Sequence, residues 1–261
     1  RSTLGNDGAN SFAMKKAALV LLAALAAAAP PAVALDPAAR PGLAPRSAEA
    51  SLGAVARLRA ANRTSGGCSA VLIAADVALT AGHCARGPVE GPRAMQLHFR
   101  PGETPPAFRV TVRAVAFHAE NERGRLTAQN AHADLALLRL AMPVPEEVAR
   151  PIPVAEGPDP EVVAIYGYVN GEADVLRGHP SCRVGTLLPG LLGSDCHVVS
   201  GLSGSPVLSG GPGNWRVEGI AVATVADERL RAFIADVTPW PDFAGPYALD
   251  EPPPLEGVLL R

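Results

Sequence analysis

Three short segments carry side chains that together can perform nucleophilic chemistry. A histidine lies in LTAGHC (79–84), an aspartate begins DLALLRL (134–140), and a serine lies in GLSGSP (201–206). Acyl transfer needs a hydroxyl nucleophile, an imidazole that takes its proton, and a carboxylate that holds the imidazole in one tautomer. Taken alone, each segment more often has a structural role. The histidine can simply neighbour a half-cystine, the aspartate can form a turn before a strand, and the serine segment can be a glycine turn. Jointly, His83, Asp134 and Ser203 fit the three catalytic roles.

The glycines beside the serine allow a tight turn in which two backbone N–H groups point to one place. These donors belong to Gly201 and Ser203, and they would stabilise a developing oxyanion.

An esterase of the α/β-hydrolase type is excluded. It requires Gly-x-Ser-x-Gly and the chain order Ser, acid, His. Here position 205 is Ser, and His83 and Asp134 both precede the serine.

Short β-type runs separated by Gly, Pro or polar clusters surround these segments and must position them. The first series covers 54–58, 70–79, 94–99, 109–117 and 135–140, and the second covers 162–168, 181–188, 197–199, 206–208 and 216–225. Residues 141–160 are rich in Pro and acidic residues and separate the two series. Residues 227–236 fit either a helix or a turn followed by a strand over 231–235. Two series of short strands predict an all-β protein of two barrels.

The segment 14–34 has the pattern of a secretory signal. Met14, Lys15 and Lys16 precede thirteen apolar residues, 17–29, and the small-residue site Ala32-Val33-Ala34 follows. Residues 1–13 precede the expected start, and 35–51 is expected to be a flexible leader or pro-segment. The remaining boundaries predict an N-terminal barrel over 52–150, a C-terminal barrel over 151–247 and an irregular tail over 248–261. We expect secretion or release into a periplasm, with no membrane attachment after the signal is cleaved.

The four cysteines are expected to form two disulfides in an oxidising compartment. Of three possible pairings, the short intervals favour Cys68–Cys84 and Cys182–Cys196. A zinc site is the rival interpretation, but no Cys-x-x-Cys pair exists. Neither a metal nor a cofactor is therefore expected. The formal net charge of -2 argues against nucleic acid as a partner, because no basic field would follow the phosphates.

With these motifs in this order, the sequence resembles the trypsin-like (chymotrypsin-fold) serine peptidases. The family's Thr-Ala-x-His-Cys, Asp-Ile/Leu-Ala-Leu-Leu and Gly-x-Ser-Gly-Gly/Ser-Pro patterns all occur, and Gly66-Gly67-Cys68-Ser69 matches the strand whose Cys pairs with Cys84. The resemblance implies two six-stranded antiparallel β-barrels with the active site at their junction. It implies that His83 is the general base, Asp134 orients it, and Ser203 is the nucleophile.

Two finer details are similar to the bacterial glutamyl-endopeptidase branch of the family. Ser205 stands in place of a second Gly, and Asp195-Cys196 lies shortly before the expected nucleophile. Digestive relatives carry an Asp before the nucleophile that pairs with a newly freed N-terminus. Leu202 stands there in this chain, so we do not expect activation by that ion pair.

Glutamate-selective relatives carry a Gly-Ile-His pattern after the nucleophile, whereas this chain has Gly-Ile-Ala at 219–221, so their specificity is not inherited. By the same resemblance, the specificity pocket is formed by His197, Val198, Ala221, Ala223 and Thr224. Thr224 replaces a Gly and narrows the pocket, which favours a small or medium apolar residue on the acyl side. Protonated His197 would instead favour an acidic residue.

These observations predict a secreted serine endopeptidase that acts on polypeptides as a monomer. The alternative is a non-catalytic binding protein on the same scaffold. All three catalytic residues are present, and loss of function would be expected to change one of them.

Overall fold

The computed structural model describes residues 41–43, 51–60, 67–86, 95–102, 108–122, 126–157, 160–172, 174–225 and 230–237. All of them belong to one compact unit, Pro37–Arg261. The predicted signal segment 14–34, residues 1–13 and the tail 248–261 lie outside the described residues. In the described part, no helix has the length and apolar character needed to cross a bilayer.

Six antiparallel strands close the N-terminal barrel in the order β2-β3-β4-β7-β6-β5. Their bounds are β2 Val55–Ala60, β3 Cys68–Ala74, β4 Val77–Ala81, β5 Met95–Phe99, β6 Arg109–Phe117 and β7 Leu135–Leu140. Side chains alternate along a strand, so β6 buries Val110 and Val112 while Arg109 and Arg113 face outward. This alternation produces the apolar interior of the barrel.

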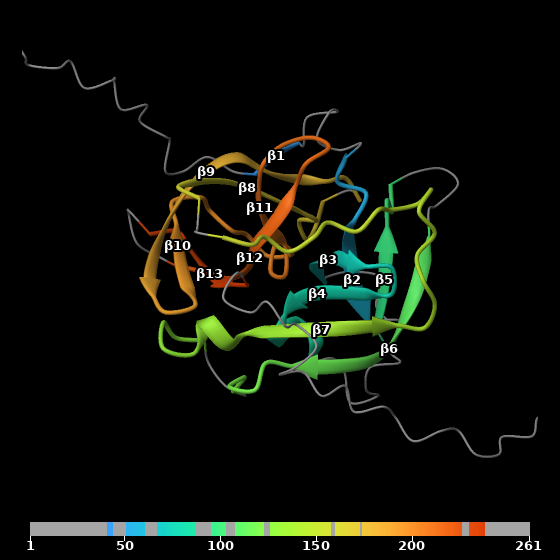
Figure 1. Cartoon of the computed structure of the whole chain (residues 1–261), viewed down its shortest axis with the longest axis horizontal. Helices are drawn as coiled ribbons and strands as arrows, with labels where there is room; N and C mark the ends of the chain where they lie inside the picture. Colours follow the sequence, from blue (N-terminus) through green and yellow to red (C-terminus); the bar gives the residue numbers. More distant parts are fainter. Residues whose placement is uncertain are drawn as a thin grey trace, which may run out of the picture. The chain divides into compact units, whose positions relative to one another are not determined.

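The C-terminal barrel also contains six antiparallel strands, in the order β9-β10-β13-β12-β11-β8, and pairing of β8 with β9 closes it. Their bounds are β8 Val162–Gly167, β9 Arg177–Leu188, β10 Leu191–Ser194, β11 Pro206–Ser209, β12 Arg216–Thr224 and β13 Ala232–Asp236. In Figure 1, β2–β7 and β8–β13 form two neighbouring groups. The prediction of two six-stranded barrels is therefore confirmed.

A two-residue strand, β1 Gly42–Leu43, adds to the edge of the second barrel, where Gly42 pairs with Gly178 and Leu43 with Arg177 of β9. These residues lie inside the segment expected to be a leader, 35–51. Part of that segment therefore pairs with the barrel as a β-strand.

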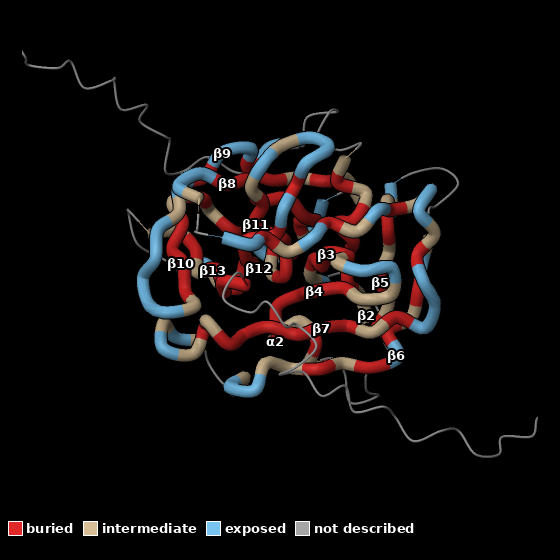
Figure 2. Tube along the Cα trace, viewed as in Figure 1, coloured by how far each residue is buried: buried red, intermediate tan, exposed pale blue. Residues whose placement is uncertain are grey.

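One apolar cluster runs through the first barrel and continues into the second. It includes Leu79 and Leu138 of the first barrel together with Tyr166 and Val217 of the second. A separate cluster fills the rest of the second barrel, around Ile165 and Leu192 among others. Figure 2 shows buried positions along the strands and exposed positions in many of the connecting loops. The shared cluster holds the two barrels against each other where the candidate site lies.

Several strand predictions need correction. The predicted strand 70–79 is two strands, β3 and β4, joined by a turn at Ala75 and Asp76. The predicted strand 197–199 does not form, because its carbonyl groups accept hydrogen bonds from outside a sheet ladder. His197 O accepts from His179 Nε2 and Val199 O accepts from Leu202 N. Of the two interpretations of 227–236, the strand is confirmed over β13.

Candidate active site

His83 and Asp134 form the best-defined interaction of the predicted site. His83 lies on the short helix α2 (Gly82–Ala85), directly after the buried strand β4. Asp134 lies between the 3-10 turn η2 (Ala131–Ala133) and β7. His83 Nδ1 is 2.6 Å from Asp134 Oδ2, and the His83 backbone N–H donates to Asp134 Oδ1 at 2.8 Å. With Asp134 side chain 1% exposed, the carboxylate is held by the residue that it must orient.

Pairing of β4 with β7 explains this approach. Ala81 is opposite Leu135, and the next residues continue the contact through a 2.8 Å bond from Gly82 N to Asp134 O. A Cβ on Gly82 would lie 2.9 Å from Asp134 Oδ1. Glycine at position 82 therefore allows the two backbones to meet closely enough for the imidazole to contact the carboxylate.

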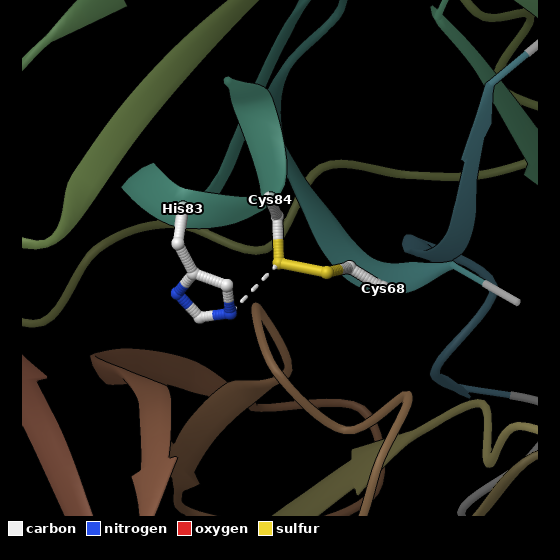
Figure 3. Close-up of side chains that lie close together, drawn as sticks. All are labelled: Cys68, His83 and Cys84. Carbon is white, nitrogen blue, oxygen red and sulfur yellow. Dashed lines mark hydrogen bonds between the residues drawn. A yellow bond between two sulfur atoms is a disulfide. The ribbon is translucent and has the colours of Figure 1, made fainter. Parts of the chain in front are cut away.

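The second ring nitrogen of His83 faces the disulfide between Cys68 and Cys84. His83 Nε2 is 3.5 Å from Cys84 Sγ, as Figure 3 shows. Both predicted disulfides, Cys68–Cys84 and Cys182–Cys196, are confirmed. The donor atoms of Cys68, His83 and Cys84 lie within 4.8 Å of one another. Because both sulfurs are in the disulfide, this cluster offers a metal no thiolate.

The loop that carries Ser203 packs against the first barrel. Ser69 N donates to Ser203 O at 2.8 Å. A Cβ on Gly204 would lie 2.1 Å from Ser69 O and 2.3 Å from Thr80 Oγ1, and Gly204 has φ +81. Only glycine fits this combination of backbone conformation and space. The loop from the second barrel is thus fixed to β3 and β4, and β4 leads to His83.

The hydroxyl of Ser203 is not bonded to the imidazole. Among the described residues, the Ser203 side chain makes no hydrogen bond, and the contact of His83 Nε2 is the one with Cys84 Sγ. The structure therefore joins two of the three predicted catalytic residues directly. The third residue, Ser203, is linked to the first barrel only through its backbone.

Two backbone amides beside Ser203 are unused. Within the part of the chain that the structure describes, neither Gly201 N nor Ser203 N donates a hydrogen bond. The intervening amide differs, since Leu202 N donates to Val199 O at 3.0 Å, and the two amides after Ser203 are also used, Gly204 N by Ala221 O at 2.8 Å and Ser205 N by Leu202 O at 2.9 Å. The available donors are the two assigned to the oxyanion from the sequence.

The residues predicted to form the specificity pocket come from the segment 197–198 and from β12. Val198 and Ala221 are buried, His197 and Ala223 are half-buried, and Thr224 is exposed. Thr224 Oγ1 donates to Val198 O, which joins the two segments. Ala221 O accepts from Gly204 N at 2.8 Å, which ties β12 to the Ser203 loop.

His179 belongs to none of the sequence motifs, yet it contacts this group. Its Nε2 donates to His197 O at 2.9 Å, and burial lowers the pKa of His179. The pair lies 18 residues apart, and no sequence pattern indicates their contact. A neutral His179 supports the backbone of His197.

A cavity of about 920 Å³ lies elsewhere, against the connection between the barrels and the β11–β12 turn, and its lining includes Arg150, Ile152 and Trp215. His83, Asp134 and Ser203 do not line it. Its size alone assigns it no part in the chemistry of the triad residues.

Comparison with known proteins agrees with this architecture. The family model of the trypsin-like peptidase domain matches residues 68–220, which is more than half of the chain. The chain belongs to this family. Among solved structures, it is similar to the scabies mite inactivated protease paralogue S-D1, with a TM-score of 0.55 and 14% identity over 70% of this chain and 87% of that one. No curated protein matches the sequence. The comparisons do not distinguish the glutamyl-endopeptidase branch.

Proposed function

We propose that the chain is an exported serine endopeptidase in which His83, Asp134 and Ser203 hydrolyse peptide bonds. The observation that carries the proposal is the 2.6 Å contact between His83 Nδ1 and Asp134 Oδ2. A carboxylate at this distance keeps the proton on Nδ1, and Nε2 is then free to accept another. Membership of a peptidase family supports the same chemistry.

In the proposed reaction, Ser203 Oγ attacks the carbonyl carbon of the scissile bond and gives its proton to His83 Nε2. The N–H groups of Gly201 and Ser203 stabilise the negative oxygen of the tetrahedral intermediate. The imidazolium then protonates the leaving amine, which departs and leaves an acyl-enzyme on Ser203. Water then attacks the acyl-enzyme carbonyl carbon and gives its proton to His83 Nε2. The bond to Ser203 Oγ breaks, which releases the carboxylic acid product and the free serine.

The missing bond between Ser203 and His83 is compatible with this mechanism. Catalytic hydrogen bonds in free enzymes are often long or poorly aligned and shorten when substrate binds. The backbone bond from Ser69 to Ser203 keeps the loop close to β3. In the proposed mechanism, Ser203 Oγ and His83 Nε2 come into contact when substrate binds, while His83 Nδ1 stays on Asp134.

For specificity, we propose that Thr224 and Val198 limit the pocket on the acyl side. The hydrogen bond between Thr224 Oγ1 and Val198 O supports a narrow pocket, which suits a small or medium apolar residue. Preference for an acidic residue through protonated His197 is the alternative, and it would increase as pH falls.

Export and a monomeric state complete the proposal. Two disulfides are compatible with an extracellular or periplasmic location, where thiols are oxidised. The predicted partner is a polypeptide substrate, and neither nucleic acid nor membrane is expected to bind.

A non-catalytic binding protein on the same scaffold is the second candidate. It is favoured by the position of His83 Nε2 against Cys84 Sγ and by the unbonded hydroxyl of Ser203. The solved relative S-D1 is described as an inactivated protease paralogue.

Digestion of a peptide library distinguishes the two candidates. The protein purified from an oxidising compartment is compared with Ser203→Ala, and cleavage products are identified by mass spectrometry. Products formed by the unaltered protein and absent with Ser203→Ala are expected. Identical products from both proteins, or none from either, would reject the proposed activity.

A further inference from the structure

Asn121 forms a bridge between the segment that carries His83 and the segment that carries Asp134. Asn121 Nδ2 donates to Ala133 O at 2.8 Å, and Arg86 Nη2 donates to Asn121 Oδ1 at 2.7 Å. Ala133 directly precedes Asp134, and Arg86 directly follows helix α2. Both ends of one carboxamide are thus used, one on each side of the His83–Asp134 pair.

The carboxamide is tightly placed within this bridge. A Cβ added to Gly82 would lie 2.4 Å from Asn121 Nδ2 and 2.9 Å from Asp134 Oδ1, so both groups lie against Gly82. The turn that carries Asn121 is anchored separately. Asn121 N donates to His118 O at 2.9 Å, and His118 N donates to Leu135 O at 3.1 Å.

We propose that Asn121 is a positioning residue that sets the geometry of His83 and Asp134. This inference rests on the proposed function, because it assigns Asn121 a role in the same reaction. Its carboxamide holds Ala133 and Arg86 at a fixed separation, and thereby fixes the carboxylate relative to the imidazole. Misplacement of a catalytic group by about 1 Å can cost about 100-fold in rate.

The chemistry of the bridge requires an amide. One end must donate to a carbonyl oxygen and the other must accept from a guanidinium, and a carboxylate cannot donate when ionised. Asn121→Asp therefore keeps the shape and the bond from Arg86, loses the bond to Ala133, and adds a negative charge near Asp134. A negative charge there favours the protonated form of the His83 imidazole.

The surroundings determine how large this electrostatic effect is. The charged or titratable groups near the bridge are Arg86 after α2, His132 and Asp134 at η2, and His118, Glu120 and Glu122 on the turn of Asn121. Glu120 Oε2 contacts His132 Nε2 at 2.9 Å on the exposed side. Because Arg86 would compensate part of the new charge, we expect the acid limb of the rate profile to move upward by only about one pH unit.

The test compares Asn121→Ala and Asn121→Asp with the matched control Asn214→Asp, which places the same charge in the exposed β11–β12 turn. For each full-length variant, kcat and KM on a cleaved peptide are measured across pH. Asn121→Ala is expected to lower kcat about 10- to 100-fold, with KM changed less than about threefold. Asn121→Asp is expected to move the acid limb of the rate profile upward by about one pH unit. Asn214→Asp is expected to change neither.

A second readout does not depend on catalysis. In the Ser203→Ala background, the ring signals of His83 are followed by NMR during a pH titration and assigned by comparison with His83→Ala. Their midpoint should move upward with Asn121→Asp and not with Asn214→Asp. Unmoved His83 signals and unchanged kcat in a folded Asn121→Asp variant would overturn the inference.

The two readouts separate this inference from the proposed function. If the unaltered protein cleaves nothing but the His83 signals respond to Asn121→Asp, the proposed function fails, and what stands is the contact of Asn121 with the His83–Asp134 pair without a role in catalysis. If the protein cleaves peptides and neither readout responds, the positioning inference fails alone. Should Asn121→Ala not fold, the isosteric aspartate variant still decides the outcome.

Discussion

Ser69 donates its backbone N–H to the carbonyl oxygen of Ser203 at 2.8 Å. This bond joins β3, which begins at Cys68, to the loop that holds the proposed nucleophile. Cys68 in turn is bonded to Cys84, the neighbour of His83. Through this hydrogen bond and this disulfide, the first barrel controls where the proposed nucleophile of the second barrel lies.

Gly204→Ala should disrupt this control. A Cβ there meets Ser69 O at 2.1 Å and Thr80 Oγ1 at 2.3 Å, and the backbone has φ +81. Gly213 has a similar φ, +88, but no atom within 4 Å of the added Cβ. We expect Gly213→Ala to cost about 1 kcal/mol from backbone strain alone. Gly204→Ala should cost more and should lower peptidase activity at least about 10-fold, since the loop must move.

Denaturant unfolding and peptide cleavage measure these effects. Equal loss of stability in the two glycine variants would show that the contact with Ser69 does not constrain the loop.

Removal of the Cys68–Cys84 disulfide should affect both stability and chemistry. Replacing both cysteines with serine is expected to lower the free energy of unfolding by about 2–4 kcal/mol in the chain-entropy picture. Because Cys84 follows His83 on α2 and the disulfide ties this helix to Cys68 of β3, activity should fall as well. The matched control replaces Cys182 and Cys196, whose bridge closes a loop of similar length. That control should lose similar stability at a smaller loss of activity, and equal activity losses would argue against a specific role for the first disulfide.

Stability should decrease between neutral and acidic pH. Burial, with Arg109 as the next cause, lowers the pKa of His98 to about 4, whereas an unfolded histidine titrates near 6.5. As pH falls below about 6.5, the unfolded chain binds a proton that the folded chain does not, and stability is lost until about pH 4. After allowance for partial solvent exposure, His98 contributes about 1–2 kcal/mol to this loss. Burial lowers the pKa of His118 and of His179 too, so they act in the same direction.

Melting temperatures measured from pH 7 to pH 4 test this expectation. His98→Gln should flatten the curve, because the variant has one fewer group to protonate in the unfolded state. Parallel curves for His98→Gln and the unaltered protein would contradict it.

Thr224→Gly should widen the specificity pocket that we propose. It removes the hydroxyl that donates to Val198 O together with the rest of the Thr224 side chain. The preference on the acyl side should extend from small or medium apolar residues to larger ones, with up to about 10-fold better kcat/KM for a substrate larger by one or two methylenes. Cleavage-site profiling of both proteins provides the measurement. An unchanged profile would mean that Thr224 does not limit the pocket.

Much of this architecture could be predicted because its signals are local. His83, Asp134 and Ser203 each lie in a short motif next to a strand with a clear apolar pattern, and the disulfides close short loops. The segment 197–199 was misjudged, because apolar Val198 and Val199 suggest a strand. Val198 is buried and Val199 half-buried outside any sheet ladder, and the carbonyls of His197 and Val199 accept from His179 Nε2 and Leu202 N.

Long-range polar contacts could not be predicted in this way. Asn121 contacts Arg86 and Ala133, residues 35 and 12 positions away, and an asparagine between acidic residues suggests only a loop. Likewise, nothing in Gly42 and Leu43 indicates that they pair with β9. Such contacts depend on how the barrels close and not on local patterns.

We propose above all that Ser203 is a nucleophile activated by His83. Reaction of the purified protein with a fluorophosphonate, followed by mass mapping of the adduct, tests this directly. We expect one adduct, on Ser203, that disappears in His83→Ala and persists in Thr224→Gly. No adduct on Ser203, before or after removal of residues 35–51, would contradict the claim and favour a binding protein.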